Sequence, residues 1–159
     1  MTRDARFEDA REAPLRLKAL EPDDLSVVSS LVQDAVFPIT EMTWRRRERR
    51  FAVLLNRFRW EDAQAERRGN RDYERVQALL VIDEVLKVAS QGIDRGDSDL
   101  VLSLLSVNFE PADAPGRKEI LTFAGDGAIA CDVEALDVTL KDVTRPYVAP
   151  SKSAPRHPD

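Results

Sequence analysis

The chain has 159 residues, of which 43% are hydrophobic and 33% are charged, and its formal net charge is −5. This composition is typical of one soluble globular domain rather than a disordered chain, and no apolar run approaches the roughly 18 residues of a membrane span. The first residues hold no apolar secretory segment, and the single cysteine, Cys131, excludes an internal disulfide, so we predict a cytoplasmic protein with no membrane association.

The charge and proline patterns divide the chain into three parts. Residues 1–13 are charged and aperiodic, and residues 146–159 hold four of the nine prolines and no apolar pattern. We therefore predict a flexible N-terminus over 1–13, a single α+β domain over 14–145 and a disordered, proline-rich tail over 146–159.

A strand and a helix are predicted at the start of the domain. Apolar residues alternate with Arg16 and Lys18 in the stretch 15–19, which is the period of a half-buried strand. Pro22 is suited to the first position of a helix. The apolar residues after it are spaced three and four positions apart and predict one early amphipathic helix: Leu25, Val28, Leu31, Val32 and Ala35.

The middle of the chain has strand-like patterns. Two β-branched and aromatic runs, at 35–44 and 50–60, flank a short arginine-rich connection and predict a hairpin. Both faces of the second run carry apolar residues, so we expect a strand that is covered on both sides. The polar stretch 61–74 predicts a loop. In the long run 75–93, the acidic pair Asp83-Glu84 predicts a bend, a bulge or a turn between two strands.

Further strands are predicted up to the end of the domain. The run 100–111 predicts a strand, and 119–133 predicts a hairpin around Gly125-Asp126-Gly127, whose glycines supply the positive φ of a tight turn. The apolar phase then changes near Glu134, and we favour a strand over a helix for 135–144. The predicted fold is α+β, a mostly antiparallel sheet curled into a roll or partial barrel, for which a pleckstrin-homology-like roll is one candidate.

The sequence lacks the groups that most catalytic sites need. Its one histidine, His157, lies in the proline-rich tail, where no packed shell would position it. One cysteine and one histidine make no zinc pattern, and the chain has no phosphate-binding loop, Rossmann glycine motif or G-x-S-x-G elbow. We predict no catalytic residue, no metal site and no cofactor, and we favour a protein that is not an enzyme.

Two other features favour a structural role over a chemical one. Cys131 alternates with Ile129 and Val133 on an apolar face, which indicates a small buried side chain rather than a redox-sensitive thiol. Asp83 and Glu84 are adjacent, so on a strand they point to opposite faces and form a carboxylate site only at a bulge.

Residues 90–99, SQGIDRGDSD, are a candidate ligand-binding loop. The stretch joins two apolar runs and combines two glycines with polar side chains, which lets backbone amides and side chains reach a ligand. Gln91 and Asp94 are the candidate ligand-binding residues here. The alternative is a hairpin connection whose glycines serve only the backbone geometry.

The arginine-rich stretch 44–61 has three interpretations. The arginines of the tip 45–50, with Trp44 and Trp60 as stacking surfaces, would form a nucleic-acid surface. The strand after the tip would instead form an anion pocket, with four candidate ligand-binding residues: Asn56, Arg57, Arg59 and Glu61. The simplest interpretation of the tip is a solvated turn whose charge is balanced by nearby acids.

Several runs of the chain resemble a known family. They are RFAVLLNRFRWE at 50–61, SQGID at 90–94, VLSLLSVNFEP at 101–111 and LTFAGDGAIACDVEALDVTLKD at 121–142. Together they resemble an uncharacterised alphaproteobacterial family, domain-of-unknown-function number 2948, over about residues 15 to 145. The resemblance implies a short, single-domain cytoplasmic protein and assigns no catalytic residue.

The function predicted from the sequence is a non-enzymatic binding or adaptor domain that recognises a protein partner or a small anionic ligand. A sizeable sheet without a catalytic constellation motivates this prediction. The alternative is a nucleic-acid-associated protein that uses the arginine-rich hairpin, which the acidic net charge disfavours. A carboxylate-dependent enzyme is a distant third, and the sequence assigns no oligomeric state.

Overall fold

The structure is a computed structural model, and it describes residues 14–59, 74–114, 116–144 and 147–148. Its elements, in chain order, are β1 (Arg16–Ala19), α2 (Pro22–Leu31), β2 (Val36–Pro38), the 3-10 turn η1 (Ile39–Glu41), β3 (Met42–Arg45), β4 (Arg50–Phe58), β5 (Glu74–Ile82), β6 (Val85–Gln91), β7 (Val101–Glu110), β8 (Lys118–Phe123), β9 (Ala128–Val133), β10 (Val138–Asp142) and β11 (Tyr147–Val148).

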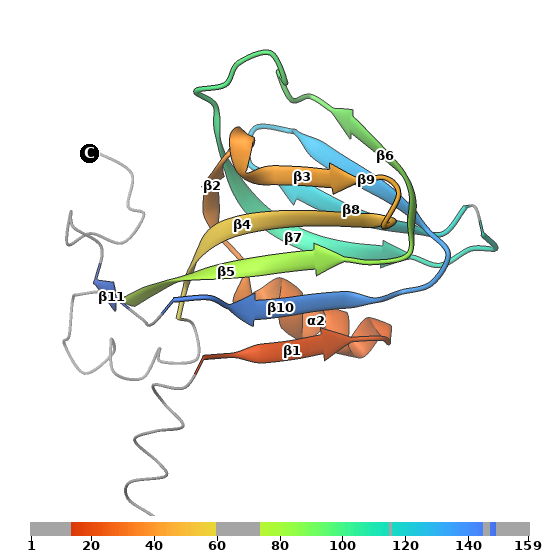
Figure 1. The fold of residues 1–159 in the computed structure, drawn as a ribbon, viewed down its shortest axis with the longest axis horizontal. Coiled ribbons are helices and arrows are strands. Elements are labelled where there is room, and N and C mark those ends of the chain that lie inside the picture. The colour runs from red at the N-terminus through yellow and green to blue at the C-terminus, as the bar shows by residue number, and fades with distance from the viewer. Residues whose placement is uncertain (1–13, 60–73, 115, 145–146, 149–159) are drawn as a thin grey trace, which may run out of the picture.

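One eleven-stranded antiparallel sheet makes up most of the fold. Neighbouring strands follow the order β1-β10-β5-β4-β2-β7-β8-β9-β6, while β3 pairs with β4 and β11 pairs with β5. Figure 1 shows that the sheet curls, with β3, β4, β5, β10 and β1 in a front layer and β7, β8 and β9 crossing behind it. Among the described strands, β1 and β6 end the path without pairing to each other, so the roll is open. The predicted α+β fold with a curled antiparallel sheet is confirmed.

The helix α2 packs against β7 and β1. Pro22 is its first residue, as predicted, and Ser29 Oγ accepts a hydrogen bond from the backbone N of Val107 on β7 (2.9 Å). The helix ends at Leu31, although the apolar spacing continues to Ala35. The reason is a turn at Asp34, whose φ of 63° is left-handed and brings the chain alongside β7.

The run 35–44, predicted as one strand, forms two strands separated by η1. Val36 of β2 lies opposite Asn56 of β4 on one side and opposite Ser103 of β7 on the other. β2 ends at Pro38, which has no N–H to donate to a ladder. η1 then turns the chain so that β3 runs along β4 only. The two halves of the sheet are therefore joined through β2, and β3 is left as an edge strand.

The other turns agree with the sequence analysis. Glu84, with a φ of 61°, makes the turn between β5 and β6, and Gly125 (85°) makes the hairpin of β8 and β9 together with Asp126 (69°). The segment predicted as a strand over 135–144 contains β10. β11 pairs with β5, so the sheet extends beyond residue 145. Most of the predicted loop at 61–74 lies outside the described residues.

The inner face of the roll is apolar, with a few buried polar exceptions such as Glu119 on β8. Glu119 is fully buried and lies opposite Phe109 of β7 and Cys131 of β9. Within the described structure, neither of its carboxylate oxygens has a hydrogen-bond partner. Desolvation therefore raises the pKa of Glu119 to about 8. Burial also raises the pKa of the Cys131 thiol to about 12, so Cys131 is the inert, buried side chain that the sequence predicts.

Glu119 makes the stability of the fold depend on pH. The folded state holds the proton up to about pH 8, whereas the unfolded chain releases it near 4.5. The stabilisation by the protonated carboxyl is therefore complete below pH 4.5 and is lost as the pH rises towards 8. Urea titrations at about pH 6 and pH 8.5 measure this loss. Between the two pH values, we expect the free energy of unfolding to fall by about 2 kcal/mol more in the wild type than in Glu119→Gln.

The matched control for this prediction is Glu110→Gln, because Glu110 is an exposed carboxylate on the neighbouring strand β7. The free energy of unfolding of the Glu110→Gln variant should change with pH as that of the wild type does. Equal pH dependence in the wild type and Glu119→Gln would contradict the prediction.

Candidate pocket between the edges of β3 and β6

A pocket opens between the edge strands β3 and β6. In the described sheet, β3 pairs with β4 and β6 pairs with β9, so no ladder closes this part of the roll. The pocket has a volume of about 310 Å³, which is within the range of small-molecule sites. Its walls come from η1, β3, β4, β6, β9 and the loop after β6: Ile39, Thr40, Met42, Trp44, Phe51, Val88, Ser90, Arg95, Ser98 and Ile129. We call it the β3–β6 pocket.

The β3–β6 pocket is apolar inside and polar at its mouth. Phe51 and Ile129 are almost fully buried at its base, and Met42 and Trp44 are half-buried on one wall. The exposed lining residues are the four polar ones: Thr40, Ser90, Arg95 and Ser98. This distribution suits a ligand with an apolar body and one polar end.

Arg95 is the charged residue among the described lining residues of the pocket, and the loop that carries it also holds Asp94, Asp97 and Asp99. No acidic residue is among the described lining residues, and no ion pair joins Arg95 to another residue of the described ranges. The nearest acids in sequence make local contacts: Asp94 Oδ1 accepts from Gly96 N and Asp97 Oδ1 accepts from Asp99 N, both at 3.0 Å. The Arg95 guanidinium is thus available to an anion from solution.

Gly92 positions the loop that carries Arg95. Its φ is 70°, and a Cβ at this position would lie 2.8 Å from the carbonyl oxygen of Asp126 in the β8–β9 turn. From the other side, a Cβ on Gly127 would lie 3.0 Å from Ile93 Cγ1. The left-handed φ favours glycine and the close approach leaves no room for a Cβ, so glycine at position 92 lets the loop after β6 lie against the β8–β9 hairpin. In Figure 1 the loop then passes above η1 before it enters β7.

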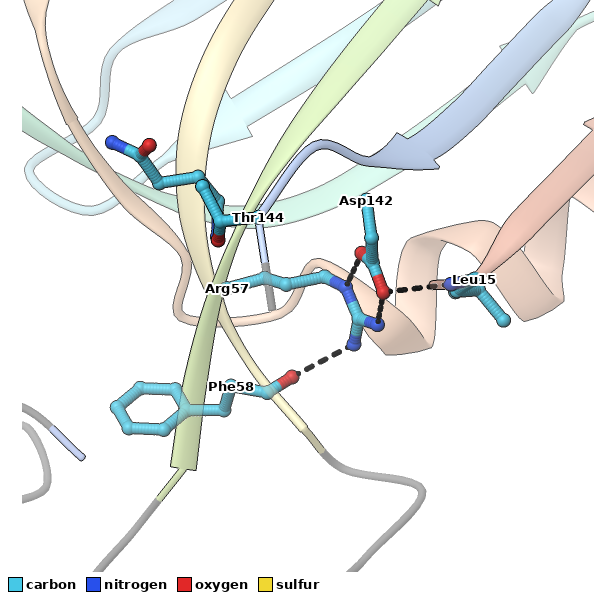
Figure 2. Close-up of polar contacts among 6 residues, drawn as sticks. Leu15, Arg57, Phe58, Asp142 and Thr144 are labelled. Carbon is cyan, nitrogen blue, oxygen red and sulfur yellow. Dashed lines mark hydrogen bonds and ion pairs between the residues drawn. The ribbon is translucent and has the colours of Figure 1, made fainter. Parts of the chain in front are cut away.

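Arg57, a predicted ligand-binding residue, is part of a buried ion pair. Figure 2 shows its Nε and Nη2 donating to the two carboxylate oxygens of Asp142, both at 2.9 Å. Its Nη1 donates to the carbonyl of Phe58 (3.0 Å), and Asp142 Oδ2 also accepts from Leu15 N (2.9 Å). The two side chains are 0% and 4% exposed. This pair ties together the ends of β4 and β10 and the chain just before β1.

A family comparison agrees with the resemblance seen in the sequence. The family described as "Protein of unknown function (DUF2948)" matches residues 15–157. The chain belongs to the DUF2948 family. Comparisons of this DUF2948 protein with curated proteins and with solved structures gave no match.

The predicted site residues of the DUF2948 protein are spread over several places. Asn56 is half-buried on β4, and Arg59 is buried directly after β4. Gln91 and Asp94 are exposed at the end of β6 and in the loop after it. Glu61 lies outside the described residues. None of the other predicted residues, Arg57 included, is among the described lining residues of the β3–β6 pocket.

The arginine-rich tip between β3 and β4 is partly neutralised. Arg49 Nη2 lies 2.6 Å from Glu134 and 3.8 Å from Glu84, and Arg50 Nε lies 2.8 Å from Asp83. The side-chain hydrogen bond to Glu134 raises the pKa of Arg49, and that to Asp83 raises the pKa of Arg50. The remaining arginines of the tip are exposed: Arg45, Arg46 and Arg47.

The predicted ligand loop, 90–99, forms part of the pocket, but the pocket as a whole was not predicted. The loop lines the pocket through Ser90, Arg95 and Ser98 rather than through Gln91 and Asp94. The other walls come from residues of the 35–44, 50–60, 75–93 and 119–133 runs, each of which predicted strands. In the described ranges of this DUF2948 domain, no cluster of three or more potential metal ligands occurs. None of the helices described has the length and hydropathy of a membrane-crossing segment.

The buried pair predicts a large loss of stability when its cation is removed. Arg57→Met leaves the Asp142 carboxylate buried without its guanidinium, and we expect the free energy of unfolding to fall by about 3–5 kcal/mol. The double variant Arg57→Met/Asp142→Leu removes both charges, so it should recover much of this loss. Chemical denaturation of the single and double variants measures the difference.

Arg45→Met serves as the control, because Arg45 is exposed, and should change the stability by less than about 0.5 kcal/mol. If the double variant were as unstable as the sum of both single variants, Arg57 and Asp142 would not act as a pair.

Proposed function

We propose that this DUF2948 domain is a non-enzymatic binding module that takes a small anionic ligand into the β3–β6 pocket. The observation that carries the proposal is the polarity of the lining, which combines an apolar interior with Arg95 at a hydroxyl-lined mouth. Pockets of this kind bind an apolar body by burial and orient its polar end with a few placed groups.

The chemistry of the lining favours binding over catalysis. A general acid or base must exchange a proton near neutral pH. A guanidinium exchanges no proton near neutral pH, and serine or threonine hydroxyls need an adjacent base before they react. The described lining contains no histidine, carboxylate, cysteine or lysine that would fill that role. A domain that binds a ligand without changing it is the function that these groups support best.

Blocking the pocket mouth should abolish ligand binding. As a probe we choose 8-anilinonaphthalene-1-sulfonate, an apolar monoanion. Trp44 lines the pocket, so a Trp60→Phe background leaves it as the sole tryptophan reporter. We expect saturable quenching of Trp44, with binding weakened at least about tenfold by Ser90→Phe, since an aromatic ring at Ser90 fills the mouth.

Ala89→Phe is the matched control, because Ala89 is exposed on the same strand and adjacent strand residues point to opposite faces. It should bind the probe as the parent does. The proposal fails if the parent shows no saturable binding, or if Ser90→Phe and Ala89→Phe bind equally well.

A second candidate function, nucleic-acid binding, rests on the exposed side chains of Arg45, Arg46 and Arg47. Phosphate contacts release counterions, so binding through this tip would weaken steeply with salt. Replacing all three residues by alanine should then reduce the slope of log K against log salt by about 2 to 3. Titration of single-stranded RNA at low salt is the measurement, and absence of binding there would remove this candidate.

A further inference from the structure

We propose that the β3–β6 pocket selects an amphipathic monocarboxylate, with its carboxylate at Arg95 and its apolar body between β3 and β6. This inference rests on the proposed function and specifies the class of ligand. It depends on three properties of the described lining, which are its single charge, the arrangement of its polar groups and its volume.

The charge of the lining favours one anionic group. Arg95 is the charged residue among the lining residues, and it lies at the exposed mouth. A second anionic group on the ligand would lie beside Phe51 and Ile129, which are 4% and 2% exposed. A charge buried there without a partner would pay a large desolvation penalty. A cationic head group would instead meet the Arg95 guanidinium and be repelled.

The polar groups at the mouth suit a carboxylate. The guanidinium of Arg95 presents a planar fork of N–H donors whose spacing matches two carboxylate oxygens. Hydroxyls of Ser90 and Ser98 line the same pocket and offer further donors. The loop acids Asp94 and Asp97 accept backbone hydrogen bonds inside the loop rather than pairing with Arg95. A carboxylate from solution can therefore take the place at Arg95.

The volume limits the apolar body. The pocket volume of about 310 Å³ lies at the lower end of the range for small-molecule sites, so it favours a short apolar body. Met42 on its wall has a flexible side chain that adapts to the shape of a ligand, and Trp44 offers a broad apolar face. An aliphatic acid of medium length, or a small aromatic acid, matches this space.

A series of ligands with the same eight-carbon body tests the inference. The probes are octanoate, 1-octanol, octylammonium and octanedioate, titrated against the Trp60→Phe protein with Trp44 fluorescence and calorimetry. We expect octanoate to bind most tightly, 1-octanol more weakly, and octylammonium and octanedioate most weakly. Arg95 is exposed and screened by solvent, so the expected preference for octanoate over 1-octanol is about fivefold. It should shrink as KCl is raised.

Variants of Arg95 separate the head-group contact from burial of the body. Arg95→Gln should weaken octanoate about fivefold and leave 1-octanol unchanged. Arg95→Glu should reverse the order, so that octylammonium binds more tightly than octanoate. Arg46→Gln is the control, because Arg46 is an exposed arginine of the β3–β4 tip that does not line the pocket, and it should leave the whole series unchanged.

The outcomes distinguish this inference from the proposed function. If neither the naphthalene sulfonate nor any eight-carbon probe binds, the proposed function itself fails. If the probes bind but octanoate has no advantage, or Arg95→Gln leaves octanoate unchanged, the pocket binds ligands and the monocarboxylate assignment is wrong. A concentration-dependent dimer in sedimentation that competes with octanoate would assign the pocket to a second copy of the chain and overturn the inference.

Discussion

The three residues of β2 hold the two halves of the sheet together. Val36 pairs with Asn56 on β4 and with Ser103 on β7, so a single short strand carries both ladders. Beyond Pro38 the chain turns through η1 and continues as β3 along β4, and β7 begins at Val101, directly opposite Pro38. In the described sheet, β3 pairs with β4 alone and β6 with β9 alone, and the pocket lies between these two edge strands.

Arg57 and Arg95 lie in contrasting environments, the first buried and the second exposed. Arg57 has no contact with water, and a guanidinium there is tolerated because Asp142 meets it with both carboxylate oxygens. Such a pair fixes which strand ends meet, and it leaves its own charge little capacity for a further anion. Arg95 is exposed and is joined by no ion pair within the described ranges, so its charge acts on what arrives from solution. Arg57 stabilises the meeting of strand ends, whereas Arg95 is the residue through which we propose that the pocket binds an anion.

The sequence predicted those parts of the fold that depend on local chemistry. Pro22 marks the start of the helix, Asp83-Glu84 the turn after β5, and Gly125-Asp126 the β8–β9 hairpin, each through the conformational preference of a few neighbouring residues. The division of 35–44 was not predictable in this way, because it depends on pairing with Ser103, which lies far along the chain. The sequence alone also does not distinguish a buried arginine from an exposed one. The partner of Arg57 is 85 residues away, so its structural role emerges only in three dimensions.

The contact of Gly92 with the β8–β9 turn separates the strands of the pocket from the loop segment that carries Arg95. Strands build the apolar walls of the pocket, and changes in them disturb the core. The segment between Ile93 and Leu100 begins at a fixed point, Gly92, and ends where the carbonyl of Leu100 accepts a hydrogen bond from Ile39. Its length and side chains can vary between these two anchors without altering a single ladder of the sheet. We therefore expect substitutions within this segment to change the head-group contact of the proposed site without disturbing the sheet, provided that glycine stays at position 92.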